Sequence, residues 1–188
     1  MEKRIIIIYM NKTSEIQRVV ITGPESTGKT ELTVALSDYY NTSYVPEYAR
    51  EYISKLSRNY NFNDIENIAR KQIELSELQF KKANRILFYD TYLIITKVWF
   101  QWVYNDCPEW LINEIEKLKT DLFLLCNNDI PWIPDPVREN GGINRKKLFE
   151  IYKSELINYG FNYEIVSGKG VTRFENAKFF VDKLVMKK

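Results

Sequence analysis

A glycine-rich stretch near the start of the chain, residues 23–30 (GPESTGKT), limits the fold more than any other feature of the sequence. It matches the pattern G-x-x-x-x-G-K-[ST]. Residues 18–22 before it form a short apolar, β-branched run that predicts a buried strand, and residues 31–36 after it have the apolar spacing of a helix. Strand, glycine loop and helix together are the context in which this pattern forms a phosphate-binding loop.

The residue types in this loop can be explained by how they would bind phosphate. The two glycines permit backbone angles and a close approach that a Cβ atom would prevent. Successive amide groups can then converge on phosphate oxygens, while the lysine charge lies near the β- and γ-phosphates and the threonine hydroxyl can bind Mg²⁺. We therefore expect ATP and Mg²⁺ as cofactors, with the nucleotide bound by Gly23, Glu25, Ser26, Thr27, Gly28, Lys29, Thr30 and Glu31.

The composition indicates a soluble globular protein. The chain has 188 residues, enough for one domain with its own core, and 45% of them are hydrophobic and 28% charged. A net charge of +2 gives no reason to expect nucleic acid as a partner, so we expect a small-molecule substrate instead. Because the chain has no histidine and only two isolated cysteines, Cys107 and Cys126, it has neither a His-based catalytic triad nor a zinc or disulfide framework.

The N-terminus carries an apolar run at residues 5–10. The run is too short to span a membrane, and no small-residue cleavage site follows it. We expect residues 1–17 to form an N-terminal extension or an extra edge strand, and residues 18–188 to form the nucleotide-binding domain. No membrane association is expected, and the predicted location is the cytoplasm.

Along the rest of the chain, predicted strands alternate with predicted helices. Further strands are expected at residues 42–45, 85–90, 121–126 and 163–166. Helices are expected at 47–53, after a cap at 63–64, after residue 91, at 144–159 and from 172 onward. This alternation predicts an α/β fold, an open parallel sheet with helices on both faces. Ligands of such sheets bind at the carboxyl ends of the strands.

Two carboxylates follow predicted strands at that edge, Glu47 and Asp90. Transfer of a phosphoryl group to a hydroxyl requires one carboxylate to orient the hydroxyl and accept its proton, and another to hold Mg²⁺. We therefore predict that both are catalytic and that Asp90 binds the metal together with Thr30. Which of the two is the general base stays open. The alternative for each is a helix cap or a solvated surface charge.

Prolines and glycines punctuate residues 131–142, which predicts a flexible loop. In a kinase, a mobile lid brings arginines to the transferring phosphate and excludes water. Arg138 and Arg145 are the candidates, the alternative being a solvated basic loop. The helical stretch after residue 91 is unusually aromatic: Trp99, Phe100 and Trp102 have the spacing of core residues, whereas Tyr92 and Trp99 lie near the active edge and could stack on a flat substrate ring.

Four motifs occur together in this chain. They are residues 20–30 (VITGPESTGKT), residues 45–52 (VPEYAREY), Asp90-Thr91, and residues 129–139 (DIPWIPDPVRE). Together they resemble the NadR-like ribosylnicotinamide kinase family, over a region from about residue 18 to near the C-terminus. One position departs from the family pattern: Tyr92 stands where an acidic or amide residue is expected.

The resemblance implies a P-loop kinase fold that transfers the γ-phosphate of ATP to the 5′-hydroxyl of nicotinamide riboside. An adenylyltransferase domain, which some family members carry, is not expected, because its H-x-G-H motif requires histidine. The alternatives are a kinase for another nucleoside, or a regulatory module that binds ATP and has no acceptor substrate. The expected substrate-binding residues are Glu47, Tyr48, Arg50, Asp90, Tyr92 and Trp99.

Overall fold

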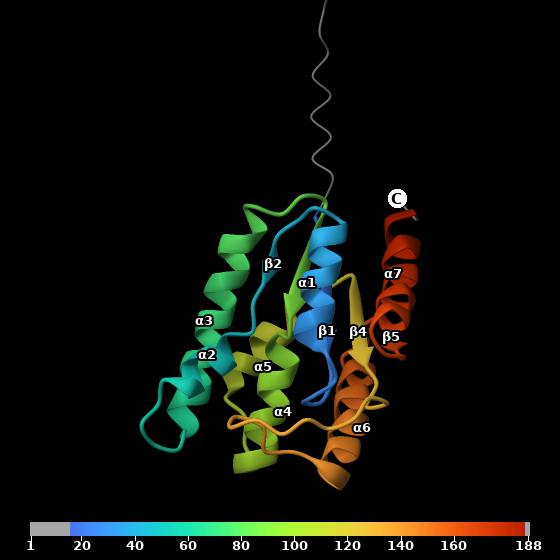
Figure 1. Cartoon of the computed structure of the whole chain (residues 1–188). Coiled ribbons are helices and arrows are strands. Elements are labelled where there is room, and N and C mark those ends of the chain that lie inside the picture. The colour runs from blue at the N-terminus through green and yellow to red at the C-terminus, as the bar shows by residue number, and fades with distance from the viewer. Residues whose placement is uncertain (1–15, 187–188) are drawn as a thin grey trace, which may run out of the picture.

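The computed structural model describes residues 16–186, whose centre is a five-stranded parallel sheet. The strand order is β2-β3-β1-β4-β5, and every neighbouring pair runs parallel (Figure 1). The strands are β1 (Gln17–Thr22), β2 (Tyr44–Val45), β3 (Ile86–Asp90), β4 (Leu122–Cys126) and β5 (Tyr163–Val166). The predicted open parallel sheet is confirmed, whereas the apolar run at residues 5–10 lies outside the described residues.

Helices cover both faces of this sheet (Figure 1). Val19 and Ile21 of β1 point to one face, where they pack with α1 (Lys29–Tyr39) and α7 (Val171–Met186). Val20 between them points to the other face. There it joins a larger core that includes α3 (Phe62–Phe80), α4 (Leu93–Tyr104), α5 (Glu109–Glu116) and α6 (Gly142–Asn158). Each residue of β3 and β4 is buried, which explains why these strands read as continuous apolar runs.

Three elements differ most from the sequence prediction. Helix α3 begins at Phe62 rather than after residues 63–64. Its cap is Asn61, whose side chain accepts a hydrogen bond from the Asp64 amide while the Asp64 carboxylate accepts one from the Asn61 amide. This reciprocal pair of hydrogen bonds is a capping box, and its first residue, Asn61, marks the start of the helix. Helix α5 was not predicted, because only two of its residues, Leu111 and Ile115, are buried. Strand β2 has two residues instead of four.

Two connections on the same side of the sheet frame the site. Helix α2 (Tyr48–Ser54) follows β2 directly, and a long coil over residues 127–141 joins β4 to α6. In Figure 1 this coil runs beneath the loop that joins β1 to α1. Among residues 16–186, no helix combines the length and apolar character that crossing a membrane requires.

Candidate active site

The loop between β1 and α1 has the geometry that its glycines predict. Gly23 has φ +133°, and a Cβ atom on it would lie 2.7 Å from the Cys126 carbonyl oxygen of β4. Gly28 has φ +73° and is the N-cap of α1. A side chain at either position would strain the backbone, and at Gly23 it would also collide with the neighbouring strand. The loop therefore opens directly onto the amino end of α1, where backbone amides and the helix dipole favour an anion.

Two side chains of the loop converge on one carbonyl. Lys29 Nζ donates to the Pro24 carbonyl oxygen at 2.9 Å, and Thr27 Oγ1 donates to the same oxygen at 2.8 Å. Lys29 is 9% exposed, so its ammonium group lies inside the loop rather than in bulk solvent. The loop thus holds a buried positive charge at the place where the sequence motif predicts phosphate.

Asp90 ends β3 beside the loop. Its Oδ2 accepts a hydrogen bond from the Thr30 hydroxyl at 2.6 Å, while its Oδ1 is buried without a hydrogen-bond partner among residues 16–186. Burial raises the pKa of Asp90, and the Thr30 hydrogen bond and the Lys29 charge oppose that shift. An unpaired carboxylate oxygen next to a hydroxyl is a donor set that fits Mg²⁺, which prefers a few protein oxygens together with phosphate oxygens and water.

The turn after β3 places this carboxylate. Thr91 has φ 65°, a left-handed conformation that costs energy for a β-branched residue, and its amide donates to the Ile21 carbonyl of β1 at 3.0 Å. In the described part of the chain, no three His, Cys, Asp or Glu side chains gather closely enough to hold a metal by themselves. A cation here would therefore depend on Thr30, Asp90 and the phosphates.

Glu47 is the N-cap residue of α2, with extended backbone (φ −69°, ψ 106°) and no side-chain capping bond. Its carboxylate faces the same cavity as the loop. Burial raises the pKa of Glu47 from its usual 4.5, the Lys29 charge lowers it, and the Asp90 charge raises it further. A carboxylate with a raised pKa and no capping bond is suited to accept a proton.

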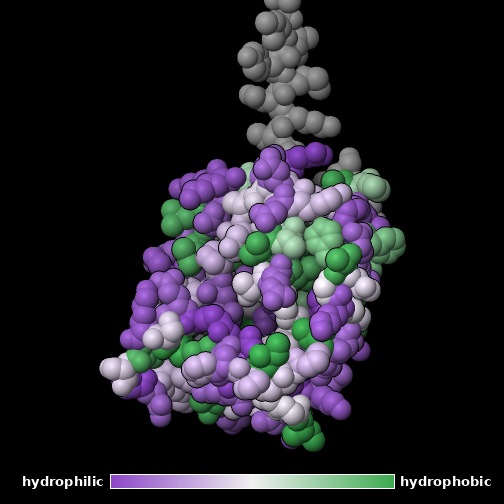
Figure 2. Space-filling model, in the orientation of Figure 1, coloured by the Kyte–Doolittle hydropathy of each residue, from purple (hydrophilic) through white to green (hydrophobic). Residues whose placement is uncertain are grey.

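The phosphate loop from Glu25 to Thr30 and Glu47 line one cleft of about 1010 Å³. Hydrophilic residues surround a recess on the lower half of the face shown in Figure 2. Of the predicted site residues, the cleft is lined by Glu25, Ser26, Thr27, Gly28, Lys29, Thr30, Glu31, Glu47, Arg50, Trp99 and Arg138.

One wall of the cleft is aromatic. Trp99 of α4 meets Tyr60 edge to face, with ring centroids 5.0 Å apart. The Tyr60 hydroxyl donates to the Glu139 carboxylate at 2.9 Å. Burial raises the pKa of Tyr60 to about 12, a Trp99 hydrogen bond lowers it, and Glu139 raises it, so the phenol stays protonated at neutral pH. Aromatic faces next to a carboxylate form a wall that suits a flat, positively charged ring.

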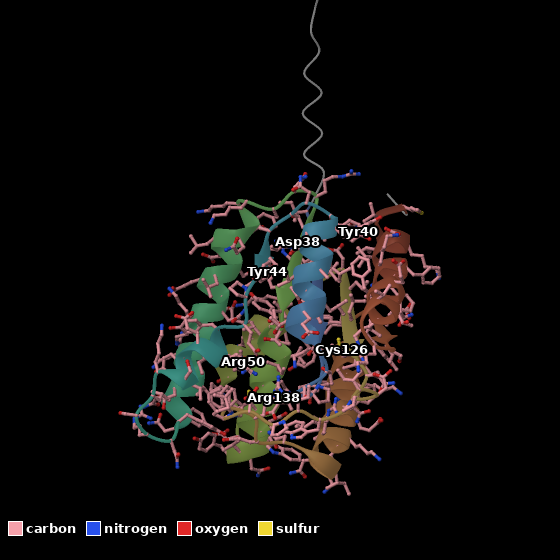
Figure 3. All side chains as sticks on the ribbon, viewed as in Figure 1. Asp38, Tyr40, Tyr44, Arg50, Cys126 and Arg138 are labelled. Atoms are coloured by element: carbon pink, nitrogen blue, oxygen red, sulfur yellow. The ribbon has the colours of Figure 1, made fainter. Side chains whose placement is uncertain are left out.

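Two arginines from different elements line the cleft. Arg50 comes from α2 and Arg138 from the coil, and both lie on the lower side of the molecule in Figure 3. Asp135 pairs with both of them: its Oδ2 lies 3.1 Å from Arg50 Nη1 and 2.9 Å from Arg138 Nε. The coil is thus attached to α2 through a shared carboxylate, and Arg138 lines the same cleft as the phosphate loop.

Five predicted site residues do not line the cleft: Gly23, Tyr48, Asp90, Tyr92 and Arg145. Arg145 is 6% exposed and donates to backbone carbonyls, so in this structure it is not placed on a mobile lid as the sequence analysis expected. Tyr92 is 8% exposed and packs against Tyr89 at 4.9 Å between ring centroids, within the core. Tyr48 packs against Tyr52, and its amide donates to Gln72. Neither tyrosine can stack on a ring bound in the cleft.

Gly23 and Asp90 also lie outside the cleft lining, Gly23 behind the loop and Asp90 beneath Thr30. The aromatic helix α4 divides as follows: Phe100 is fully buried, whereas Trp99 and Trp102 reach the cleft. Tyr60 and Glu139 line the cleft, but the sequence analysis did not predict either of them as a site residue. Tyr60 stands alone among polar residues between α2 and α3, so no periodic pattern marks it, and Glu139 was read only as part of a motif.

A family model described as an AAA domain matches residues 18–173. The chain belongs to this family. The trifunctional NAD biosynthesis/regulator protein NadR of Salmonella typhimurium is 28% identical over 146 residues, and NadR of Escherichia coli K12 is 27% identical over the same length. Each match covers 76% of this chain but only 36% of the relative, so the chain spans little more than a third of either protein.

Solved structures show the same fold. A NadR structure in complex with NR has a TM-score of 0.70 at 23% identity, and covers 90% of this chain and 49% of that chain. NadR in complex with NAD and AMP-PNP has the same TM-score and coverage at 25% identity. Deoxyadenosine kinase from M. mycoides has a TM-score of 0.61 at 13% identity, and covers 89% of this chain and 100% of that chain. The resemblance that the motifs indicated is confirmed, and so is the P-loop kinase fold.

Proposed function

We propose that this chain is an ATP-dependent kinase that phosphorylates the 5′-hydroxyl of nicotinamide riboside. One observation supports this most directly: a single cleft combines the phosphate loop, an uncapped carboxylate at Glu47 and the aromatic wall of Tyr60 and Trp99. A module that only binds ATP needs neither of the last two. The similarity to NadR, of which one structure holds NR and another AMP-PNP, supports the same substrates.

The reaction follows from the positions of the side chains. Lys29 and the loop amides bind the phosphates, and the 5′-hydroxyl lies toward Glu47. The hydroxyl oxygen forms a bond to the γ-phosphorus as the bond to the ADP oxygen breaks, and the hydroxyl proton moves to the Glu47 carboxylate. Arg138 offsets the negative charge that redistributes in the transition state.

Thr30 and Asp90 would hold Mg²⁺, because their oxygens are adjacent and one carboxylate oxygen is unpaired. When bound there, the ion neutralises charge on the phosphate oxygens. Asp90 is buried against Thr30 and does not line the cleft, whereas Glu47 does. We therefore assign Glu47 as the base and Asp90 as the metal ligand.

A transfer assay tests the proposal. The chain is incubated with ATP and one acceptor at a time: nicotinamide riboside, uridine, cytidine or the uncharged reduced riboside. The Lys29→Ala variant serves as the inactive control. We expect the highest kcat/KM with nicotinamide riboside. Equal values for all acceptors would identify a general nucleoside kinase. ATP binding without any transfer would identify the regulatory module instead.

A further inference from the structure

Arg145 is a buried arginine that the proposed reaction does not use. It lies near the start of α6, and its side chain is 6% exposed. Its guanidinium donates to three carbonyl oxygens: Nε to Glu25 at 3.1 Å, Nη2 to Ser26 at 2.7 Å and Nη1 to Ile130 at 2.7 Å. Each of the three guanidinium nitrogens therefore already donates to a backbone carbonyl.

Two of these carbonyls belong to the phosphate loop. In a trans peptide the C=O and the N–H point in opposite directions. Fixing the Glu25 and Ser26 carbonyls therefore also fixes the amides of Ser26 and Thr27, which point to the opposite side, toward the cleft. Ser26 has φ 56°, a left-handed conformation that is unfavourable for a residue with a side chain. The two hydrogen bonds from Arg145 offset that strain.

The same dipeptide also holds the coil at two places, near its middle and at its C-terminal end. The Ser26 hydroxyl accepts from the Ile133 amide at 2.9 Å, next to the Ile130 carbonyl that Arg145 binds. At the C-terminal end of the coil, the Glu25 carboxylate accepts from the amides of Glu139 at 3.0 Å and Asn140 at 2.9 Å. The shape of the phosphate loop and the position of the coil that carries Arg138 are thus linked through Glu25 and Ser26.

We propose that Arg145 is a positioning residue for nucleotide binding: it holds the phosphate loop in its binding shape and joins it to the coil, and it does not contact phosphate. This inference rests on one part of the proposed function, the binding of ATP, and does not depend on which acceptor the chain phosphorylates. A guanidinium that braces the loop supports every phosphate the loop binds. A guanidinium that touches the γ-phosphate supports only a triphosphate.

Calorimetric titrations with ADP and with AMP-PNP separate these roles. Arg145→Met should weaken the binding of both nucleotides by the same factor, about tenfold or more, because three charge-assisted hydrogen bonds are lost. Arg145→Lys should weaken both equally as well, because an ammonium group cannot reach three diverging carbonyls. Arg138→Met, the matched lid variant, should instead weaken AMP-PNP binding more than ADP binding. Lys97→Met removes another buried cation, one that pairs with Glu155 of α6 at 2.6 Å, and controls for general loss of stability.

A loss confined to AMP-PNP, or a lysine variant with full affinity for both nucleotides, would overturn the proposal, since either result indicates direct phosphate contact. Unchanged affinity in both Arg145 variants would also overturn it, as would an equal loss in Lys97→Met. If Arg145→Met does not fold, Arg145→Lys carries the same comparison. The titrations contain no acceptor. They would therefore still test the role of Arg145 if the chain did not phosphorylate nicotinamide riboside.

Discussion

The Thr30 hydroxyl and the Asp90 carboxylate lie 2.6 Å apart, although 60 residues separate them in the chain. Parallel pairing of β1 with β3 brings them together, since Ile21 and Asp90 are register partners and the phosphate loop starts directly after β1. The sheet thus fixes where β3 ends relative to the phosphate loop, and the Thr30 hydroxyl in the first turn of α1 meets the Asp90 carboxylate there.

Asp90→Asn should weaken the response to Mg²⁺. The amide keeps the shape of the carboxylate but loses its charge, so we expect the Mg²⁺ concentration for half-maximal transfer to rise about 10- to 100-fold. Measuring transfer across a Mg²⁺ titration tests this. Asp38→Asn, at an exposed position near the far end of α1, is the control. A normal Mg²⁺ dependence of Asp90→Asn would refute the assignment of the metal ligand.

Glu47→Gln should lower kcat by about 10²–10⁴ with little change in ATP affinity, because only the proton acceptor is removed. The pH profile carries a second signature. Since burial raises the pKa of Glu47, activity of the unmodified chain should fall with decreasing pH at a value above the usual 4.5. The glutamine variant should lack this limb. If it retains the limb, or if its ATP affinity collapses, Glu47 is not the base.

The same substitution should change stability in the opposite sense. A carboxylate whose folded-state pKa is raised stabilises the fold below its unfolded pKa and loses that contribution as the pH rises through the folded value. At neutral pH, without ATP or Mg²⁺, Glu47 is thus a net cost to stability. We expect Glu47→Gln to raise the Tm at pH 7 and to lose this advantage near pH 4. A Tm difference independent of pH would contradict the raised pKa.

The fold was predictable because its signals are strong. Strands β3 and β4 are buried on both faces and read as unbroken apolar runs, and the spacing of the two glycines before α1 is specific to a phosphate-binding loop. The cleft was predictable only in part. Tyr92 lies only two residues after Asp90, but after the turn at Thr91 it packs against Tyr89 in the core.

The two lid arginines show a second limit of sequence reading. Arg138 and Arg145 look alike in sequence, both near prolines and glycines. The start of α6 at Gly142 separates them: it leaves Arg138 in the coil and places Arg145 inside the first turn of a helix, beneath the phosphate loop. The helix expected at residues 144–159 already included Arg145, so what the sequence pattern lacked was the surface against which the first turn of that helix packs.

Arg138→Ala should lower kcat by about 10³ or more, with a smaller effect on the KM for ATP, because its charge is needed most when negative charge redistributes in the transition state. Steady-state kinetics at saturating nicotinamide riboside measure both constants. Lys146→Ala removes an exposed charge nearby on α6 and should have little effect. A loss confined to KM would show that Arg138 binds only ground-state phosphate.

Trp99→Leu tests whether the aromatic wall recognises charge. Nicotinamide riboside carries a permanent positive charge on a flat ring, and a cation over an aromatic face contributes about 0.5–2 kcal/mol. Losing the indole should therefore lower kcat/KM for nicotinamide riboside by about 2- to 30-fold.

The uncharged reduced riboside has nearly the same shape and lacks the cation, which makes it the control acceptor for the same variant. Its kcat/KM should change much less, because a leucine still covers the ring and only the attraction to the cation is lost. The Tyr60 phenol and the Glu139 carboxylate remain in the variant, so some preference for the charged ring should survive. An equal loss for both acceptors would mean that Trp99 only shapes the cleft, and the preference for a cation would then have to come from the carboxylates alone.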